Sequence, residues 1–407
     1  MKILFLTSRF PWPPHRGDRL TVLEMLRAFS ARHEVTFATF VDEPPSAEAM
    51  AAVSPHCARI VTVEISRARS WAQAWLGLFS PLPSQVTYYA SGRMRATIAQ
   101  IVRDGGFDAV IAHAVRTSAY VSDLGHPLTV LFQGDSVGQV LGGSLKFTPW
   151  WKRPGVLWER WRVDRYLAAQ THRFTETWLL SESDARDVER LGGERARVVP
   201  HGVDARLFDL VRTPAREPRV MFLGNLSVPH NIDAAEYAAR EVWPLVTAAG
   251  AQGRLLLAGA DPVPAVRRLA REGAIEVTGR VPDLADLWRI VHVLLAPLRF
   301  STGIQNKVLE AMAAGVPVVT TPPVAEAIGA RHGEHVLTAS DTAGLAAAVD
   351  ATLRDPAAAQ ARARAAREHV RAHFSWDTPV RRLEQLHAPQ EGASHADPAR
   401  VTPGASG

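Results

Sequence analysis

The sequence has one cysteine, Cys57, so no disulfide can form within the chain and a cysteine-rich zinc site is excluded. Long apolar runs are also missing, because no stretch approaches the roughly 20 residues that a membrane-spanning helix needs. The apolar run at residues 1–6 stops at Thr7, short of the roughly 7–15 apolar residues of an export signal. We therefore expect a cytoplasmic protein, either free or peripheral at the inner face of a membrane.

Lysine is scarce in a chain that is nevertheless basic. There are 46 basic and 41 acidic residues, for a net charge of +5, and the only lysines are Lys2, Lys146, Lys152 and Lys307. A preference for arginine in an alanine-rich chain is typical of a genomic base composition. Because a basic balance suits nucleic acid, anionic lipid and phosphorylated small molecules alike, charge alone does not select a partner.

The composition is that of a folded protein with a large core. The 407 residues are 47% hydrophobic and 21% charged, which excludes a mostly disordered chain. Such a length suits two domains of roughly 150–200 residues each.

Short apolar runs alternate with helical patterns along the chain, which predicts an α/β protein with doubly wound parallel sheets. A proline-bearing polar stretch at residues 212–218 separates two such series, so we expect domains at residues 1–205 and 206–375. The tail at 388–407 is rich in Pro, Gly, Ser and Ala and is expected to be disordered. The expected strands are residues 2–7, 33–40, 109–112, 128–132, 177–180, 197–199, 219–223, 253–258, 275–278, 293–296 and 316–320.

The most informative segment is residues 297–319. A strand ends at Pro297, a small polar loop follows, and we expect a helix that begins near Gly303. The start of such a helix attracts phosphate through its free N–H groups and its dipole. Lys307 could add a positive charge for a diphosphate, and Glu310, on the same helix face, could accept hydrogen bonds from ribose. An ordinary surface ion pair between these two side chains is the alternative.

The order of motifs along the chain carries a family resemblance. A proline- and glycine-bearing loop at 9–18, Pro-His-Gly-Val-Asp at 200–204 and the segment Gly-Ile-Gln-Asn-Lys-Val-Leu-Glu-Ala-Met-Ala at 303–313 occur in that order, with further matches at 222–226 and 277–281. Together they resemble the retaining, nucleotide-sugar-dependent glycosyltransferases of family 4. With Pro-His-Asn-Ile-Asp at 229–233, the motifs are most similar to those of sugar transferases associated with exosortase-type exopolysaccharide systems.

The resemblance implies a GT-B fold, with two Rossmann-like doubly wound parallel-sheet domains facing a cleft. A helix at 376–387 would pack back on the first domain. The implied reaction moves a sugar from a nucleoside diphosphate sugar to a saccharide or polyprenyl-linked acceptor, with retention, in polysaccharide biosynthesis. A sugar-nucleotide epimerase and a catalytically degenerate GT-B scaffold at the membrane are the alternatives.

The resemblance also implies roles for individual residues. Gly17 would border the donor phosphates, Glu310 would bind ribose, and Lys307 with the backbone of 303–306 would hold the diphosphate. Arg280 and Val281 would border the base. The implied donor-binding residues are Gly17, Arg280, Val281, Arg299, Gly303, Ile304, Gln305, Asn306, Lys307 and Glu310.

Two residues are candidates for catalysis in the first domain. His113 ends a strand and would touch the donor sugar, although a strand-end histidine is often an ordinary hydrogen-bonded residue. Asp135 could meet an acceptor hydroxyl, or it could cap the next helix.

The chain departs from the family pattern at three positions. Thr302 stands where the wider family often has the first of two glutamates, and Asn225 and His230 stand where many members have an arginine and a lysine. Lys307, the helix start and Arg299 would then take over the diphosphate. Because the chain has no Asp-x-Asp triplet, we expect neither a metal nor another cofactor, and the leaving charge must be met by basic side chains and the helix dipole.

Residues 146–173 contain seven basic residues and four of the eleven tryptophans. Trp and Arg at helical spacing suit a lipid headgroup interface, so membrane contact is one interpretation of this stretch. Nucleic acid would need the same ingredients, but we expect no nucleic acid partner. The alternative is that the tryptophans pack inward and the arginines stay solvated.

Overall fold

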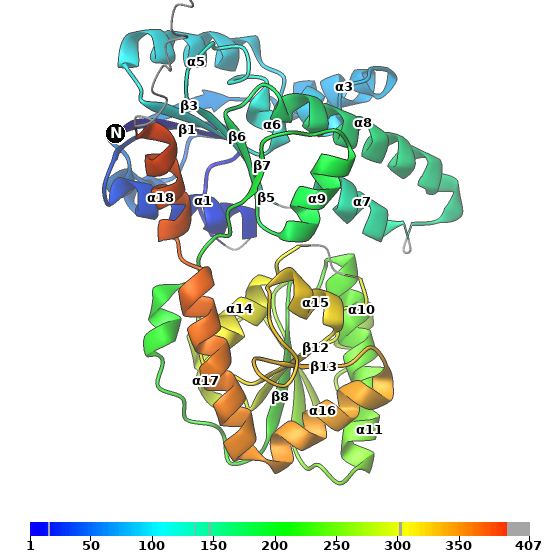
Figure 1. The fold of residues 1–407 in the computed structure, drawn as a ribbon. Helices are drawn as coiled ribbons and strands as arrows, with labels where there is room; N and C mark the ends of the chain where they lie inside the picture. Colours follow the sequence, from blue (N-terminus) through cyan, green and yellow to red (C-terminus); the bar gives the residue numbers. More distant parts are fainter. Residues whose placement is uncertain (15–16, 135, 146–147, 301–302, 389–407) are drawn as a thin grey trace, which may run out of the picture.

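The computed structural model describes residues 1–14, 17–134, 136–145, 148–300 and 303–388. Two lobes, each built on a parallel sheet with helices on both faces, make up the molecule (Figure 1). The predictions for Asp135, for Thr302 and for the tail beyond Ala388 lie outside the described residues.

The N-terminal lobe contains a seven-stranded parallel sheet with the order β3-β2-β1-β4-β5-β6-β7. Its strands are β1 (Lys2–Thr7), β2 (Glu34–Val41), β3 (Arg59–Glu64), β4 (Ala109–His113), β5 (Thr129–Gly134), β6 (Glu176–Leu179) and β7 (Ala196–Val198). Its helices are α1 (Gly17–Ser30), α2 (Ala47–Val53), η1 (Ser54–His56), α3 (Arg67–Leu76), η2 (Gly77–Phe79), α4 (Ser84–Tyr88), α5 (Gly92–Gly105), α6 (Val115–Ser118), α7 (Val137–Ser144), η3 (Trp150–Lys152), α8 (Arg153–Thr171) and α9 (Glu182–Arg190).

The C-terminal lobe contains a six-stranded parallel sheet with the order β10-β9-β8-β11-β12-β13. Its strands are β8 (Arg219–Leu223), β9 (Arg254–Ala258), β10 (Ile275–Gly279), β11 (Val293–Ala296), β12 (Val318–Thr320) and β13 (Leu337–Thr338). Its helices, with the connecting turn η4, are η4 (Ala205–Asp209), α10 (Pro229–Tyr237), η5 (Ala238–Val242), α11 (Trp243–Ala248), α12 (Pro264–Arg267), α13 (Leu284–Ile290), α14 (Asn306–Ala313), α15 (Pro322–Ala327), α16 (Thr342–Arg354) and α17 (Pro356–His373).

The predicted fold class is confirmed, since both sheets are parallel and doubly wound. The two strands absent from the predicted set are the edge strands β3 and β13. The strand order reverses between β1 and β4 in one sheet and between β8 and β11 in the other. Ligands of open α/β sheets bind outside the carboxyl ends of the strands at such reversal points.

Short polar residues fix where several helices of the first lobe begin. The Oγ atoms of Ser46, Ser91 and Ser181 each accept a hydrogen bond from the backbone N–H three residues on, which starts α2, α5 and α9. Under α1, the ring of Phe29 packs edge-on against Phe5 of β1, with ring centroids 6.3 Å apart. These contacts fix α1 against the sheet and so fix its first residue, Gly17.

The chain passes between the lobes twice. After β7 it crosses at residues 199–204, and after α17 it returns so that α18 (Asp377–His387) lies beside α1 of the first lobe (Figure 1). Arg382 of α18 forms an ion pair with Glu176 of β6, and Arg32 at the end of α1 pairs with Asp377. The last helix is therefore attached to the first lobe by charge as well as by packing.

None of the helices within the described ranges is both long and apolar enough to cross a bilayer.

Candidate active site

A cavity of about 860 Å³ lies between the lobes, at the carboxyl ends of the strands of both sheets. The first lobe contributes the loop and helix that follow β1, and the second contributes the ends of β8, β9 and β10 together with the start of α14. Six of the predicted donor-binding residues line it together, and these are Gly17, Arg280, Val281, Asn306, Lys307 and Glu310.

Two helices begin at this cavity, one from each lobe. α1 begins at Gly17 and α14 begins at Asn306. A Cβ atom placed on Gly17 would lie 4.0 Å from Nδ2 of Asn306, so the two helix starts face each other at close range. The first turn of a helix carries N–H groups that have no acceptor within the helix, together with the positive end of the dipole, so the space between two helix starts suits an anion.

The start of α14 differs from the predicted one. Gly303 has a φ of +71°, in the left-handed region, and Ile304 is buried in the core. The chain therefore becomes helical only after Gln305, which holds the N-cap position. Gly303, Ile304 and Gln305 do not line the cavity in this conformation, whereas Asn306, the first helical residue, does.

Lys307 is held in the wall of the cavity by two groups of its own lobe. Its Nζ donates to Oδ1 of Asn231 at 2.6 Å and lies 5.0 Å from the ring centroid of Phe222. Burial lowers the pKa of Lys307 to about 7, against a smaller raising effect of Glu310. An anion bound at this point would favour the charged ammonium, so the site is electrostatically prepared for one.

Glu310 lies one helical turn further along α14. Burial raises its pKa to about 7, and Asp204 raises it further, while Lys307 acts in the opposite direction. Lys307 and Glu310 are half-buried in the cavity wall, which differs from the exposed surface pair of the alternative interpretation.

Of the three positions that depart from the family pattern, the structure describes Asn225 and His230. The Oδ1 atom of Asn225 accepts hydrogen bonds from the backbone N–H and the hydroxyl of Ser227, and its Nδ2 donates to Asp261. Burial, with a contribution from Lys307, lowers the pKa of His230 to about 4, so this imidazole is neutral at physiological pH. Asn225 lines the cavity without supplying a charge.

Arg299 makes contacts within its own lobe. Its guanidinium forms a two-pronged ion pair with Asp233 and lies 4.5 Å from the ring centroid of Tyr237. It is not among the residues that line the cavity. A role in holding diphosphate stays a prediction, and it would require Arg299 to share its charge with Asp233.

His113 lies in the core of the first lobe. Its ring packs against Phe5 and Phe132, with centroid distances of 6.5 and 5.5 Å, and it does not line the cavity. Burial, with a contribution from Arg116, lowers its pKa to about 3. The imidazole is therefore neutral at physiological pH, and its predicted contact with the donor sugar stays a prediction.

The far side of the cavity is formed by the loop between β10 and α13. Arg280 and Val281 lie in this loop and line the cavity together with Trp288 of α13, and Arg280 lies 3.9 Å from Asp261. Asp283 caps α13 by accepting from the backbone N–H of Ala285. This part of the wall has an apolar surface beside a basic side chain. Such a combination suits a nucleoside.

Several residues of the site had no predicted role. Asn231 lies in a motif noted in the sequence, but that motif does not indicate that Asn231 accepts a hydrogen bond from Lys307. Asp204 raises the pKa of Glu310. His201 of the first crossing stacks on Trp376 of the second, with ring centroids 5.2 Å apart, and both line the cavity. A sequence pattern cannot show such pairs, because their members come from distant parts of the chain.

Across the described ranges, no three His, Cys, Asp or Glu side chains gather in a way that could hold a metal ion.

Comparison with known sequences finds a match to one family model within the second lobe. Residues 217–355 match the model of "Glycosyl transferases group 1". The chain is 29% identical over 251 residues to glycogen synthase of Mycobacterium tuberculosis (strain CDC 1551 / Oshkosh), an alignment covering 55% of this chain. The alignment covers 58% of the length of that relative.

Comparison with solved structures extends over both lobes. Sucrose-phosphate synthase from Thermosynechococcus elongatus superposes with a TM-score of 0.69 at 17% identity, over 95% of this chain and 98% of that one. HepE of Anabaena in complex with UDP gives a TM-score of 0.66 at 15% identity, over 95% and 99% of the two chains. The same Anabaena protein has also been solved with UDP-glucose. These likenesses and the two parallel sheets show that the chain has the GT-B fold, with a cavity between its lobes that six of the ten predicted donor-binding residues line.

Proposed function

We propose that the protein is a glycosyltransferase that uses a nucleoside diphosphate sugar. The observation that carries this proposal is the pair of facing helix starts, Gly17 and Asn306, with Lys307 in the cavity wall beside them. Such a site suits two linked phosphates, because it offers the first turns of two helices and one cation. The match to "Glycosyl transferases group 1" and the UDP complexes of HepE support a nucleotide sugar as the ligand.

We assign the parts of the donor to the cavity wall as follows. The diphosphate lies between the two helix starts and Lys307, the ribose hydroxyls donate to Glu310, and the base lies against Arg280 and Val281. Gly17 lets the first lobe approach the phosphates closely, since it has no side chain.

The proposed reaction proceeds with retention and without a metal ion. The bond from the anomeric carbon to the phosphate oxygen breaks, a bond to an acceptor hydroxyl oxygen forms on the same face, and the hydroxyl proton passes to the leaving phosphate oxygen. The charge that develops on the leaving diphosphate is met by Lys307 and the helix dipoles. Positioning of donor and acceptor between the lobes supplies the remainder of the acceleration.

For the acceptor we propose a saccharide, free or carried on a polyprenyl lipid, in the synthesis of a polysaccharide. The similarity to glycogen synthase supports transfer of sugar to a growing polysaccharide. The motif resemblance supports an extracellular polymer.

The test is release of nucleoside diphosphate from a panel of nucleotide sugars, with and without saccharide and lipid-linked acceptors. Transfer predicts release that depends on acceptor, and a product with the donor's anomeric configuration. Isomerisation of the donor without release would instead identify an epimerase. A protein that binds no nucleotide sugar at all would be a scaffold, and either result would overturn the proposal.

A further inference from the structure

The first lobe carries two exposed apolar segments outside the proposed active site. The first contains α3 and η2, where Trp71, Trp75 and Phe79 are all exposed, Phe79 to 92%. The second contains η3 and the first half of α8, where Trp150, Trp151, Trp158 and Trp161 are exposed. The tryptophans of residues 146–173 that the structure describes therefore do not pack inward.

The two segments form one surface. The indole Nε1 of Trp158 donates to the carbonyl of Leu78 at 3.3 Å, which joins α8 to η2. Glu159 accepts from the backbone N–H of Ser84 at 2.8 Å, which joins α8 to the start of α4. In Figure 1, α3 and α8 lie on the same flank of the upper lobe. We call the exposed aromatic residues of both segments the tryptophan surface.

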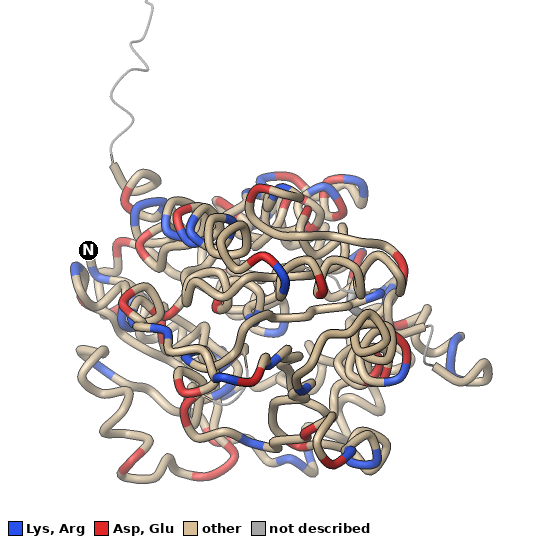
Figure 2. The backbone as a smooth tube through the Cα atoms, turned by 90° about the horizontal axis from the view of Figure 1, so that it is seen from below, with Lys and Arg blue, Asp and Glu red and all other residues tan. Residues whose placement is uncertain are grey.

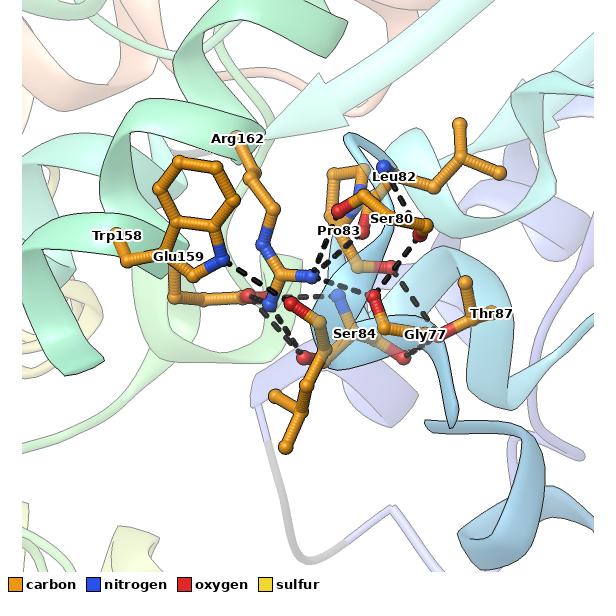
Figure 3. A network of polar contacts seen from close by, with 10 residues as sticks. Gly77, Ser80, Leu82, Pro83, Ser84, Thr87, Trp158, Glu159 and Arg162 are labelled. Carbon is orange, nitrogen blue, oxygen red and sulfur yellow. Dashed lines mark hydrogen bonds and ion pairs between the residues drawn. The ribbon is translucent and has the colours of Figure 1, made fainter. Parts of the chain in front are cut away.

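A buried arginine holds the loop that carries Phe79. Nη1 of Arg162 donates to the carbonyls of Gly77, Ser80 and Leu82, at 2.8, 3.3 and 2.9 Å (Figure 3). Nη2 donates to the hydroxyl of Ser84 and pairs with Glu159. The side chain of Arg162 is fully buried, so this arginine does not stay solvated as the alternative interpretation of residues 146–173 required.

This arrangement fixes the loop by polar contacts beneath it. The apolar side chains above, led by Phe79, contribute little to folding because they stay in water. Contiguous exposed apolar surface of this kind on a folded protein marks an interaction site. The loop is therefore built to present Phe79 and its neighbours rather than to bury them.

The charge around the tryptophan surface is mostly basic, although Asp42 pairs with Arg67 at the start of α3. Residues 65–103 contain no Asp or Glu, and Arg69, Lys152 and Arg153 are exposed within or beside the surface. The two carboxylates of α8 in this region, Glu159 and Asp164, pair with Arg162 and Arg160. Over the molecule as a whole, basic and acidic positions are interspersed along the backbone (Figure 2).

This charge pattern selects the partner. A second copy of the chain, docked through the same surface by a two-fold axis, would bring like charges together. An anionic lipid surface instead offers the opposite charge to arginine and lysine, and its headgroup region accommodates tryptophan. Arg165 lies 5.8 Å from the ring of Trp161, which keeps a cation at the depth of the aromatic ring.

We propose that the tryptophan surface docks the first lobe on a bilayer containing anionic phospholipid, with Phe79 and Trp75 entering the headgroup region. The proposal goes beyond the proposed function and does not depend on it, since docking requires neither donor nor acceptor.

The test is sedimentation of the full chain with phosphatidylcholine vesicles, with and without phosphatidylglycerol. We expect binding to vesicles that contain phosphatidylglycerol only. The variant Trp75→Ser with Phe79→Ser should bind at least about tenfold more weakly, because both apolar anchors are gone. The matched control, Leu191→Ser with Leu245→Ser, removes exposed leucines away from the surface and should bind as the wild type does.

A charge variant tests the second half of the proposal. Arg69→Gln with Lys152→Gln should weaken binding and reduce its salt sensitivity, while Arg268→Gln with Arg364→Gln on the second lobe should not. All four variants should keep the melting temperature and UDP binding of the wild type, which separates this test from that of the proposed function. Absent vesicle binding, equal binding by the anchor variant and its control, or a dimer that Phe79→Ser dissolves would each overturn the proposal.

Discussion

At the scale of single residues, Lys307 and Glu310 are the pair on which the candidate site depends. Burial moves their pKa values toward each other, down for the ammonium and up for the carboxyl, so that both reach about 7. Both line the cavity, and ionisable groups whose pKa values are shifted by burial in a cleft are typical of a functional site.

Lys307→Ala should weaken donor binding at least about tenfold, equivalent to about 1.4 kcal/mol, because the cation beside the facing helix starts is lost. Calorimetric titration with UDP measures the effect. Arg268→Ala, an exposed basic residue of the same lobe, serves as the control and should bind normally. Equal affinities for the two variants would remove Lys307 from the site.

The affinity for UDP should also fall as the pH rises above 7. Lys307 is charged below its pKa of about 7 and neutral above it. Well above that pKa, each further pH unit lowers the charged fraction of Lys307 by about tenfold. The window from pH 7.5 to 9 suits the measurement, because a phosphate with a second pKa near about 6 is already ionised there. In Lys307→Arg the guanidinium stays charged, so the slope should disappear. A wild-type affinity independent of pH would contradict this account.

The residue types of the site were predictable from the sequence, but their partners were not. Lys307 and Glu310 stand out through their spacing and through the rarity of lysine. Nothing in the pattern shows that Asn231 receives the Lys307 hydrogen bond or that Arg299 pairs with Asp233, since these contacts join separate elements. The burial of His113 could not be predicted for the same reason, because only the packed structure places Phe5 and Phe132 beside it.

At the scale of elements, most strands lie where their apolar runs predict them. The edge strands β3 and β13 were missed for different reasons. β3 is partly exposed, so its apolar run is weak, and β13 has only two residues. The start of α14 was placed too early, because Gly303 and Ile304 fit a helical pattern but take a left-handed turn and a core position.

Arg162 in α8 provides the element-scale prediction. Arg162→Met should destabilise the protein by about 3 kcal/mol, because three carbonyls and Glu159 lose their buried donor. Hydrogen exchange should rise in residues 77–84 before the rest of the lobe. Arg160→Met is the matched control, since its pair with Asp164 is more exposed and should contribute within about 1 kcal/mol. Similar exchange in both variants would show that Arg162 does not hold the loop.

At the scale of the whole molecule, the two crossings of the chain meet beside the cavity. Gly202 of the first crossing lies against Trp376 of the second, and a Cβ atom on Gly202 would lie 2.3 Å from the backbone nitrogen of Trp376. The relative placement of the lobes therefore depends on a close contact between the two connecting segments.

Gly202→Ala should lower stability by about 1–3 kcal/mol and weaken UDP binding, because the crossings must separate and both line the cavity. Thermal unfolding and calorimetry measure the two effects. Gly92→Ala meets open space and should change neither quantity. Normal UDP binding in Gly202→Ala would show that the crossings do not set the geometry of the cavity.

The return of the chain after α17 has a consequence for how the protein is made. Trp12 and Trp376 line the same cavity, although they come from nearly opposite ends of the sequence. While the ribosome is still translating the second lobe, the first can fold but has no finished pocket to offer. Nascent chains that stall before Trp376 should thus be unable to capture a nucleotide, however well their completed portions have folded.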